Sequence, residues 1–236
     1  MDIAYQHRWP ETTAEAYKIQ EAVLERVIID GNTDEPETIA AVDTAYGHGG
    51  ERIYAVAVAM RFPSLEEVER VYSQAEVSFP YHPGLFFFRE GRVIIDALSR
   101  LQCDVDLILS GSHGIAHPNR CGLACHLGVA FDRPTIGCAR RILVGEHRPV
   151  GETKGMSQPI AYRNREVGIA YRSKDNVKPI FISPAHRCDL NFARDITVRS
   201  LRGFRLPEPL RIAHLLANKH KRFIEKKPRK HQPRPA

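Results

Sequence analysis

The chain has 236 residues, of which 43% are hydrophobic and 26% are charged, with a formal net charge of +6. These values are typical of a soluble globular domain and exclude a largely disordered chain. No run reaches the roughly 20 apolar residues that a membrane span needs, and the N-terminus lacks the pattern of a secretory signal. Five cysteines without paired CxxC spacing are typical of free thiols in a reducing compartment. We therefore expect a cytoplasmic protein.

The positive charge is concentrated at the C-terminal end. Residues 219–236 hold eight Lys or Arg and one acid, Glu225, so this segment carries +7 while the preceding residues sum to −1. A basic, proline-bearing terminus such as KKPRKHQPRP is typical of a disordered segment. It either binds polyanions without sequence preference or only keeps the chain in solution. We expect one domain over residues 1–220 and a disordered basic tail over residues 221–236.

The first part of the chain predicts one helix followed by three strands. Apolar residues recur at helical spacing over residues 12–29, after a Pro-Glu-Thr start signal. Residues 38–46 and 52–60 are short apolar runs typical of strands, and the GHGG sequence at 47–50 predicts a hairpin turn between them. Residues 70–77 alternate sufficiently to predict a third strand.

Helices and strands alternate in the middle of the chain. Residues 87–101 predict a helix, residues 106–110 a buried strand, residues 123–131 a helix and residues 134–137 the start of another strand. Three successive strands followed by this alternation predict an α/β fold with a mixed sheet flanked by helices.

A polar, turn-rich stretch at residues 145–159 predicts a long surface loop. Beyond it we expect strands over residues 167–171 and 178–182 and helices over residues 190–201 and 210–223. No low-complexity linker interrupts the chain before the tail, which supports a single domain.

Four isolated titratable residues are ambiguous by themselves. Asp43 lies inside an apolar run, so it either pairs with a cation or bonds to backbone amides at a strand end. Glu90 is placed as an acid near a helix start, where the helix dipole favours it. His186 and His214 are each either a structural histidine or part of an active site.

The sequence PYHPG, formed by Pro80, Tyr81, His82, Pro83 and Gly84, predicts a rigid turn that presents an aromatic ring. An aromatic side chain held on such a loop can act as a wedge or as a stacking platform for bases. The alternative is a tyrosine that caps the hydrophobic core.

The segment after the strand at 106–110 contains small residues and two histidines, His113 and His117, in a loop where a backbone or ligand can approach closely. These histidines are candidates for binding phosphate or a metal. The spacing of Cys121, Cys125 and His126 suggests zinc, but no second ligand pair accompanies it. We expect these three residues to pack in a helix.

Five strings taken together resemble the endonuclease V family, in the same order and over residues 12–218. They are AVDTAY, PYHPGLFFFRE, GSHGIAHPNRCGLACHLGVAFDRPTIGCARR, FISPAHR and GFRLPEPLRIAH. The resemblance implies an RNase H-like fold and a Mg²⁺-dependent (or Mn²⁺-dependent) DNA-repair endonuclease. Such an enzyme recognises a deaminated purine such as inosine and cuts the second phosphodiester on its 3′ side. Some family members act on inosine in RNA.

The resemblance also assigns the candidate catalytic residues. It places Asp43 at the first metal-binding aspartate and Glu90 at a glutamate that supports the metal directly or through water. His214 falls on the late active-site histidine, with His186 as a second candidate. Arg140 stands where the family has a catalytic lysine.

The same resemblance assigns the nucleic-acid-binding residues. Tyr81 falls on the wedge that separates the strands, framed by prolines, and Gly84 and His117 line the path of the lesion or phosphate. The implied binding set is Pro80, Tyr81, His82, Pro83, Gly84, Gly111, Ser112, His113, Gly114 and His117.

Two departures from the family pattern bear on catalysis, and the first is Gly111, which stands where the family has its second metal-binding aspartate. Glycine offers no side-chain ligand, and Asp106 would project to the opposite face of its strand. Ser110 and Ser112 offer only hydroxyls. The second is Arg140, which keeps the positive charge of the lysine but not its compact ammonium.

Two hypotheses follow from these residues. The first is an endonuclease V-type nuclease that works with a reduced metal site. The second is a catalytically impaired homologue that binds inosine-containing or structured DNA or RNA without cutting it. A pure interaction protein is a third alternative. We expect a monomer in each case, with Mg²⁺ or Mn²⁺ bound weakly or not at all if the site is inactive.

Overall fold

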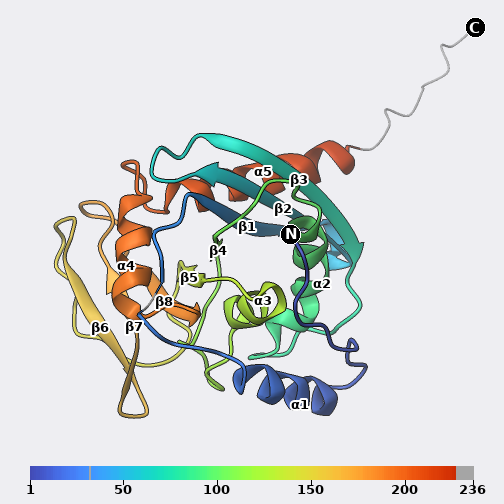
Figure 1. Cartoon of the computed structure of the whole chain (residues 1–236), viewed down its shortest axis with the longest axis horizontal. Coiled ribbons are helices and arrows are strands. Elements are labelled where there is room, and N and C mark those ends of the chain that lie inside the picture. The colour runs from blue at the N-terminus through green and yellow to red at the C-terminus, as the bar shows by residue number, and fades with distance from the viewer. Residues whose placement is uncertain (32, 227–236) are drawn as a thin grey trace, which may run out of the picture.

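A mixed sheet of eight strands forms the centre of the computed structural model, which describes residues 1–31 and 33–226 (Figure 1). The strand order is β3-β2-β1-β4-β5-β8-β7-β6. β1 pairs in parallel with β4, and β4 with β5, whereas the other neighbours are antiparallel. The strands are β1 (Thr38–Tyr46), β2 (Arg52–Arg61), β3 (Glu67–Glu76), β4 (Leu107–Ser110), β5 (Thr135–Ala139), β6 (Ser157–Tyr162), β7 (Arg165–Tyr171) and β8 (Ile180–His186).

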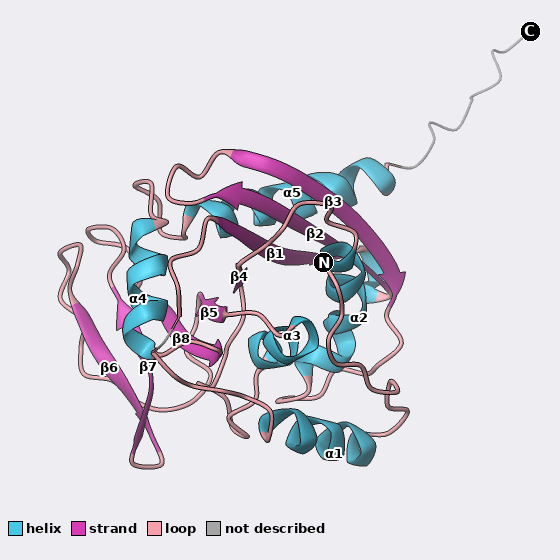
Figure 2. Cartoon of the chain, in the orientation of Figure 1, coloured by secondary structure: helices cyan, strands magenta, loops and turns pink. Residues whose placement is uncertain are grey.

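Helices cover both faces of this sheet, as the cyan and magenta elements of Figure 2 show. One face packs against α2 (Phe86–Ser99) and α3 (Leu123–Phe131), and the other packs against α4 (Leu190–Arg199) and α5 (Glu208–Ile224). α1 (Thr13–Leu24) lies against α3. The expected α/β fold with a mixed, helix-flanked sheet is confirmed.

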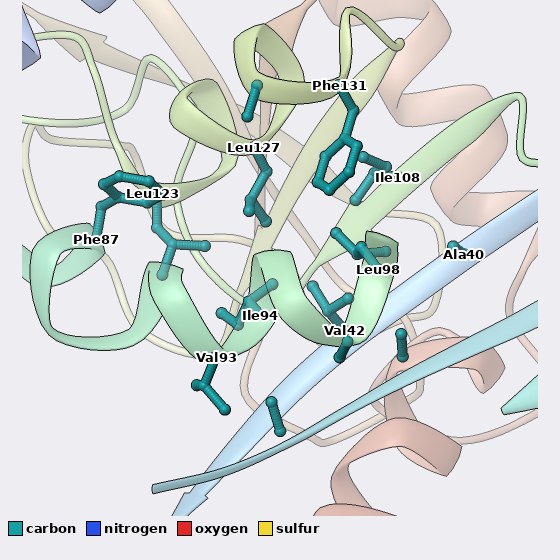
Figure 3. Close-up of a cluster of buried hydrophobic side chains, with 14 of the residues drawn as sticks. Ala40, Val42, Phe87, Val93, Ile94, Leu98, Ile108, Leu123, Leu127 and Phe131 are labelled. Atoms are coloured by element: carbon teal, nitrogen blue, oxygen red, sulfur yellow. The ribbon is translucent and has the colours of Figure 1, made fainter. Parts of the chain in front are cut away.

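The strand β1 is buried on both faces, which explains why its sequence is a nearly continuous apolar run. Successive side chains of a strand point to opposite faces. Ala40 and Val42 join the core beneath α2 and α3 (Figure 3), whereas Ile39 and Ala41 join the core beneath α4 and α5. By the same alternation, Asp43 is directed to the α5 side.

The connection between β1 and β2 is the tight hairpin that the GHGG sequence predicts. It contains a short 3₁₀ turn, η1 (His48–Gly50), and the two strands pair antiparallel from Thr38 with Arg61 to Tyr46 with Ile53. Gly49 and Gly50 both have positive φ angles, of 79° and 74°. Glycine adopts this conformation without steric cost.

The prediction of a loop over residues 145–159 is wrong at its C-terminal end, because β6 begins at Ser157. Pro159 lies inside this strand and made it resemble a loop, since proline lacks the N–H that a central strand needs. β6 is the last strand of the sheet. An edge strand tolerates proline because one of its sides has no neighbouring strand.

Two helix ends also differ from the expectation. α1 stops at Leu24, five residues before the predicted end, and Arg26 and Val27 continue with turn-type hydrogen bonds. α5 runs to Ile224, so the first four residues of the predicted tail are helical. Residues 227–236 of that tail lie outside the described residues. Within the described part of the chain, no helix is long and apolar enough to cross a membrane.

Candidate functional site

A cleft of about 580 Å³ opens beside the ends of β1 and β4. Its walls bring together the four residues expected to act in catalysis, Asp43, Glu90, Arg140 and His214, with the exposed Tyr81. The binding residues His82, Pro83, Gly84, Gly111, Ser112, His113 and His117 also line it. Among the expected residues, Pro80, Gly114 and His186 are not part of the lining.

Both oxygens of the Asp43 carboxylate have partners. Oδ1 accepts a hydrogen bond from the backbone N–H of Thr44 at 2.9 Å, and Oδ2 lies 2.7 Å from Nδ1 of His214. Nη2 of Arg140 lies 3.6 Å from the same Oδ2. Both alternatives left open by the sequence therefore apply to Asp43, since it accepts a hydrogen bond from a backbone N–H and also contacts cationic or polar side chains.

Glu90 is an interior carboxyl group, with 5% of its surface exposed. It is the fifth residue of α2, so the interpretation as an acid at the helix start is wrong. Its Oε2 accepts a hydrogen bond from Oγ1 of Thr44 at 2.9 Å. Burial raises the pKa of Glu90 to about 7, hydrogen bonds from Thr44 and Tyr46 oppose this rise, and the charge of Asp43 adds to it.

Tyr81 is exposed over 69% of its surface, which excludes the alternative that it caps the core. The next residue, His82, packs edge-on against Tyr17, with ring centroids 5.7 Å apart. Gly84 closes the turn with a φ of +82°, a conformation that favours glycine. A Cβ at Gly84 would lie 3.7 Å from the ring of His117. The turn thus places an aromatic ring at the mouth of the cleft.

Gly111 lies beside Asp43 at the end of β4. A Cβ at this position would lie 3.6 Å from Asp43 Oδ1, at ordinary contact distance, and the backbone of Gly111 is not left-handed. The hydroxyls of Ser110 and Ser112 bond to each other at 2.7 Å. Oδ2 of Asp106 accepts the backbone N–H groups of residues 37 and 38 at the start of β1, so Asp106 does not replace the missing side chain.

The histidines of the loop after β4 are neutral at physiological pH. Burial lowers the pKa of His113 to about 4, although a hydrogen bond with the Arg141 backbone opposes the shift. Burial also lowers the pKa of His117 to about 4, with His113 contributing. Neutral rings in this wall act as hydrogen-bonding groups and not as fixed cations.

Gly114 packs against the sheet and does not line the cleft. A Cβ there would come within 2.1 Å of the Pro184 carbonyl oxygen of β8, and the N–H of Gly114 donates to Ser183 Oγ at 2.8 Å. Only glycine allows this approach, so we assign Gly114 a structural role in holding the loop.

His186 has structural partners away from the cleft. Its Nε2 lies 3.2 Å from Oδ1 of Asp132, and its Nδ1 accepts the backbone N–H of Ile28 at 3.3 Å. His186 thus joins β8 to the segment after α1. Its placement as a second active-site candidate is wrong.

The zinc alternative for the helix residues is also wrong. Cys121 and Cys125 are buried free thiols, and His126 is stacked on Phe87 with ring centroids 4.0 Å apart. These residues pack in and beside α3, as the small-residue interpretation predicts.

Comparison with known proteins identifies the family of this chain. An endonuclease V family model matches residues 21–215. The chain belongs to the endonuclease V family. An endonuclease V of Nostoc punctiforme is 41% identical over 213 residues, which cover 90% of this chain and 96% of the relative. One of Roseiflexus castenholzii is 39% identical over 212 residues, covering 90% of this chain and 95% of the relative.

Solved endonuclease V structures share the fold. The Streptomyces avermitilis protein has a TM-score of 0.87 at 36% identity and covers 92% of this chain and 96% of its own. The Bacillus subtilis protein has a TM-score of 0.90 at 28% identity, with coverages of 96% and 99%. The RNase H-like α/β fold expected from the family motifs is confirmed. A Ciona intestinalis endonuclease V, solved with a DNA containing an inosine followed by a ribo-adenosine, has a TM-score of 0.78 at 24% identity, with coverages of 90% and 98%, and shows likeness of fold alone.

Endonuclease V proteins are typically metal-dependent, so the donor atoms of the cleft decide whether a cation fits. Mg²⁺ prefers carboxylate and other oxygen ligands. Here Asp43 is engaged on both oxygens, Glu90 is buried with its Oε2 bonded to Thr44, and Gly111 supplies no ligand. No group of three or more His, Cys, Asp or Glu able to hold a metal occurs within residues 1–31 and 33–226. The residues present do not fit a tightly held divalent cation.

Two functional contributions were missed by the sequence analysis. Thr44 and Tyr46 hold the Glu90 carboxyl group, and both follow Asp43 in the AVDTAY string. The period-2 alternation of a strand could have placed them on the α2 side. Arg205 donates to the backbone oxygen of Arg140 at 2.7 Å, and this contact across 65 residues has no local sequence signal.

Proposed function

We propose that this protein recognises nucleic acid that contains a deaminated purine such as inosine, and that it cleaves the 3′ phosphodiester very slowly or not at all. Family membership supports the choice of substrate. The Ciona intestinalis relative, which holds an inosine-containing DNA, offers a parallel within the same fold. A deaminated base pairs weakly, so its extrusion from a duplex costs less than that of a normal base.

The turn that carries Tyr81 supports the binding half of the proposal. An exposed ring between Pro80 and Pro83 is held at low entropic cost, because proline restricts the backbone. Inserted between bases, such a ring replaces stacking that is lost when the strands separate. The cleft behind it is large enough to take an extruded base, since ligand pockets typically start at about 300 Å³.

The glycine at position 111 is the single observation that carries the catalytic half. A Cβ there would lie 3.6 Å from Asp43 Oδ1, so an aspartate at this position would put a second carboxylate beside Asp43. Phosphodiester hydrolysis assisted by a metal needs such ligands to fix the cation against the reacting oxygens. Position 111 is glycine, and Asp43 already contacts His214 and Arg140. The site therefore lacks the carboxylate ligands that would fix a cation.

The active nuclease is a second candidate function, in the role of DNA repair. It is favoured by the presence of Asp43, Glu90 and His214 in one cleft, the set that the family resemblance assigns to catalysis. In this case another group would do the work of the missing carboxylate. The cut would fall on the 3′ side of the lesion.

One experiment separates the two candidates. Inosine-containing and matched adenine-containing oligonucleotides, as DNA and as RNA, are assayed for binding and for cleavage in Mg²⁺ and in Mn²⁺. The proposal expects selective binding of the inosine strand with little or no cleavage. Equal affinity for inosine and adenine strands would refute the recognition. Robust cleavage that is lost in Asp43→Ala would establish the active nuclease instead.

A further inference from the structure

We infer that Arg140 and Arg141 hold a backbone phosphate of the bound strand directly in the cleft, so that binding needs no divalent cation. This inference rests on the proposed function, because it names the groups that hold the nucleic acid in that same cleft. The inference goes beyond the proposed function because it assigns the neutralisation of the phosphate to two guanidinium groups instead of a metal ion.

The charges around the cleft support direct phosphate binding. Even with Asp43 and Glu90 both counted as ionised, Arg140 and Arg141 balance them, and all four residues line the same cleft. A third carboxylate at Gly111 would give this group a net charge of −1. A phosphate approaching such a site would need a cation to offset the repulsion, whereas the site as it stands does not repel it.

Arg140 is held in place from two sides. Arg205 donates from Nη2 to the backbone oxygen of Arg140 at 2.7 Å, and the same guanidinium group donates to the backbone oxygens of Lys178 and Pro179. The side chain of Arg140 lies 3.6 Å from Asp43, and 43% of its surface is exposed. The backbone is therefore fixed while the N–H groups remain accessible.

The chemistry of a guanidinium group suits this role. It is planar and always charged, and it presents five N–H donors in a fork that matches two phosphate oxygens at once. Asp43 is at ion-pair distance from Nη2 but beyond hydrogen-bonding distance. A phosphate can therefore accept bidentate hydrogen bonds from Arg140 while Asp43 keeps the side chain directed into the cleft.

The test measures binding and not activity, with a fluorescently labelled single-stranded inosine oligonucleotide and anisotropy as the readout. Each protein is titrated in EDTA and in Mg²⁺ at matched ionic strength, because salt alone changes affinity. The unmodified protein is expected to bind with the same Kd, within about twofold, in both buffers. Loss of binding in EDTA would overturn the inference.

Two substitutions sharpen the test. Arg140→Gln should weaken binding about tenfold or more in EDTA, because a charge-assisted hydrogen bond is lost. Arg194→Gln, at an exposed residue of α4 outside the cleft, removes the same charge and should leave Kd within about twofold. An equal effect of both substitutions, or no effect of Arg140→Gln, would overturn the inference.

Gly111→Asp should reverse the dependence on metal. The added carboxylate repels phosphate in EDTA, so Kd should rise about tenfold, and Mg²⁺ should restore it. An unchanged Kd in EDTA for folded Gly111→Asp, checked by its melting temperature, would count against the charge balance. Equal binding of inosine and adenine strands in EDTA would refute the proposed recognition while leaving the arginine-held phosphate intact.

Discussion

Gly111 faces Asp43 so closely that a Cβ at position 111 would lie 3.6 Å from Asp43 Oδ1, at normal contact distance and without backbone strain. The local fold therefore accepts a side chain at the position where the family resemblance implies a second metal-binding aspartate. The absence of that carboxylate reflects the residue type and not a change in the backbone. This relationship makes the proposed loss of catalysis directly testable.

Gly111→Asp is expected to create Mg²⁺-dependent cleavage of an inosine substrate, at least about 100-fold above the unmodified protein, with a further gain from Arg140→Lys. The reason is that two adjacent carboxylates fix the cation that one cannot. Cleavage rates and calorimetric Mg²⁺ binding measure the effect. Gly111→Ala adds a Cβ at the same position without a carboxylate and serves as the control. A folded Gly111→Asp protein that neither binds Mg²⁺ nor cleaves would disprove the explanation.

Tyr81→Ala should weaken binding to an inosine duplex more than binding to the single strand. The loss of base–aromatic stacking is worth about 1–3 kcal/mol, so we expect roughly a five- to 150-fold rise in the duplex Kd. The melting temperature should hold, because Tyr81 is 69% exposed. Phe223→Ala removes another exposed aromatic ring, 74% exposed, outside the cleft and is the control. A drop in stability with unchanged binding would return Tyr81 to a structural role.

Glu90→Gln should stabilise the protein above pH 7. The pKa of Glu90 rises from 4.5 to about 7 on folding, chiefly through burial, so the folded chain keeps a proton that the unfolded chain releases. Stability is therefore lost as pH rises from 4.5 to 7. Removing the ionisable group should recover about 2–3 kcal/mol at pH 8 and little at pH 4.5. Urea denaturation of both proteins at pH 8 and pH 4.5 measures the change in the free energy of unfolding. An equal change at the two pH values would contradict the prediction.

Three buried histidines should make the fold sensitive to acid. Burial lowers the pKa of His113 and His117 to about 4 and that of His126 well below its usual range. Below pH 6.5 the unfolded chain binds protons that the folded chain does not, so stability falls as pH falls. Each histidine adds a slope of about 1.4 kcal/mol per pH unit. His126→Phe should reduce the slope of the free energy of unfolding against pH by the contribution of one histidine between pH 6.5 and 5. An unchanged slope would contradict the lowered pKa of His126.

Truncation after Lys226 should lower the affinity for all nucleic acids alike without lowering the melting temperature. It removes four Lys or Arg residues, which should reduce the log–log salt slope on duplex DNA by up to about 3.6. Removal of residues 221–236 should also destabilise the fold, because Glu225 accepts the backbone N–H of His48 in η1 at 3.0 Å. An unchanged salt slope in the shorter truncation would assign the tail to solubility.

Several elements were predictable because their signals are local. β1 and α3 both match their predicted bounds. Each is an apolar run that is followed within a few residues by residues typical of a turn or a helix end. β6 was missed because Pro159 is compatible with a strand only at a sheet edge. Which strand lies at the edge depends on the order of the whole sheet.

The sequence alone determined the fold class, the family motifs and the substitution at Gly111, because these depend on residue type and short-range spacing. The tertiary structure decided which side chains meet. It placed His214 against Asp43 across 171 residues, buried Glu90 enough to raise its pKa, and directed His186 to Asp132 instead of the cleft. These features arise from the packing of α2, α5 and β8 around β1, since burial and contact depend on distant elements that no local pattern encodes.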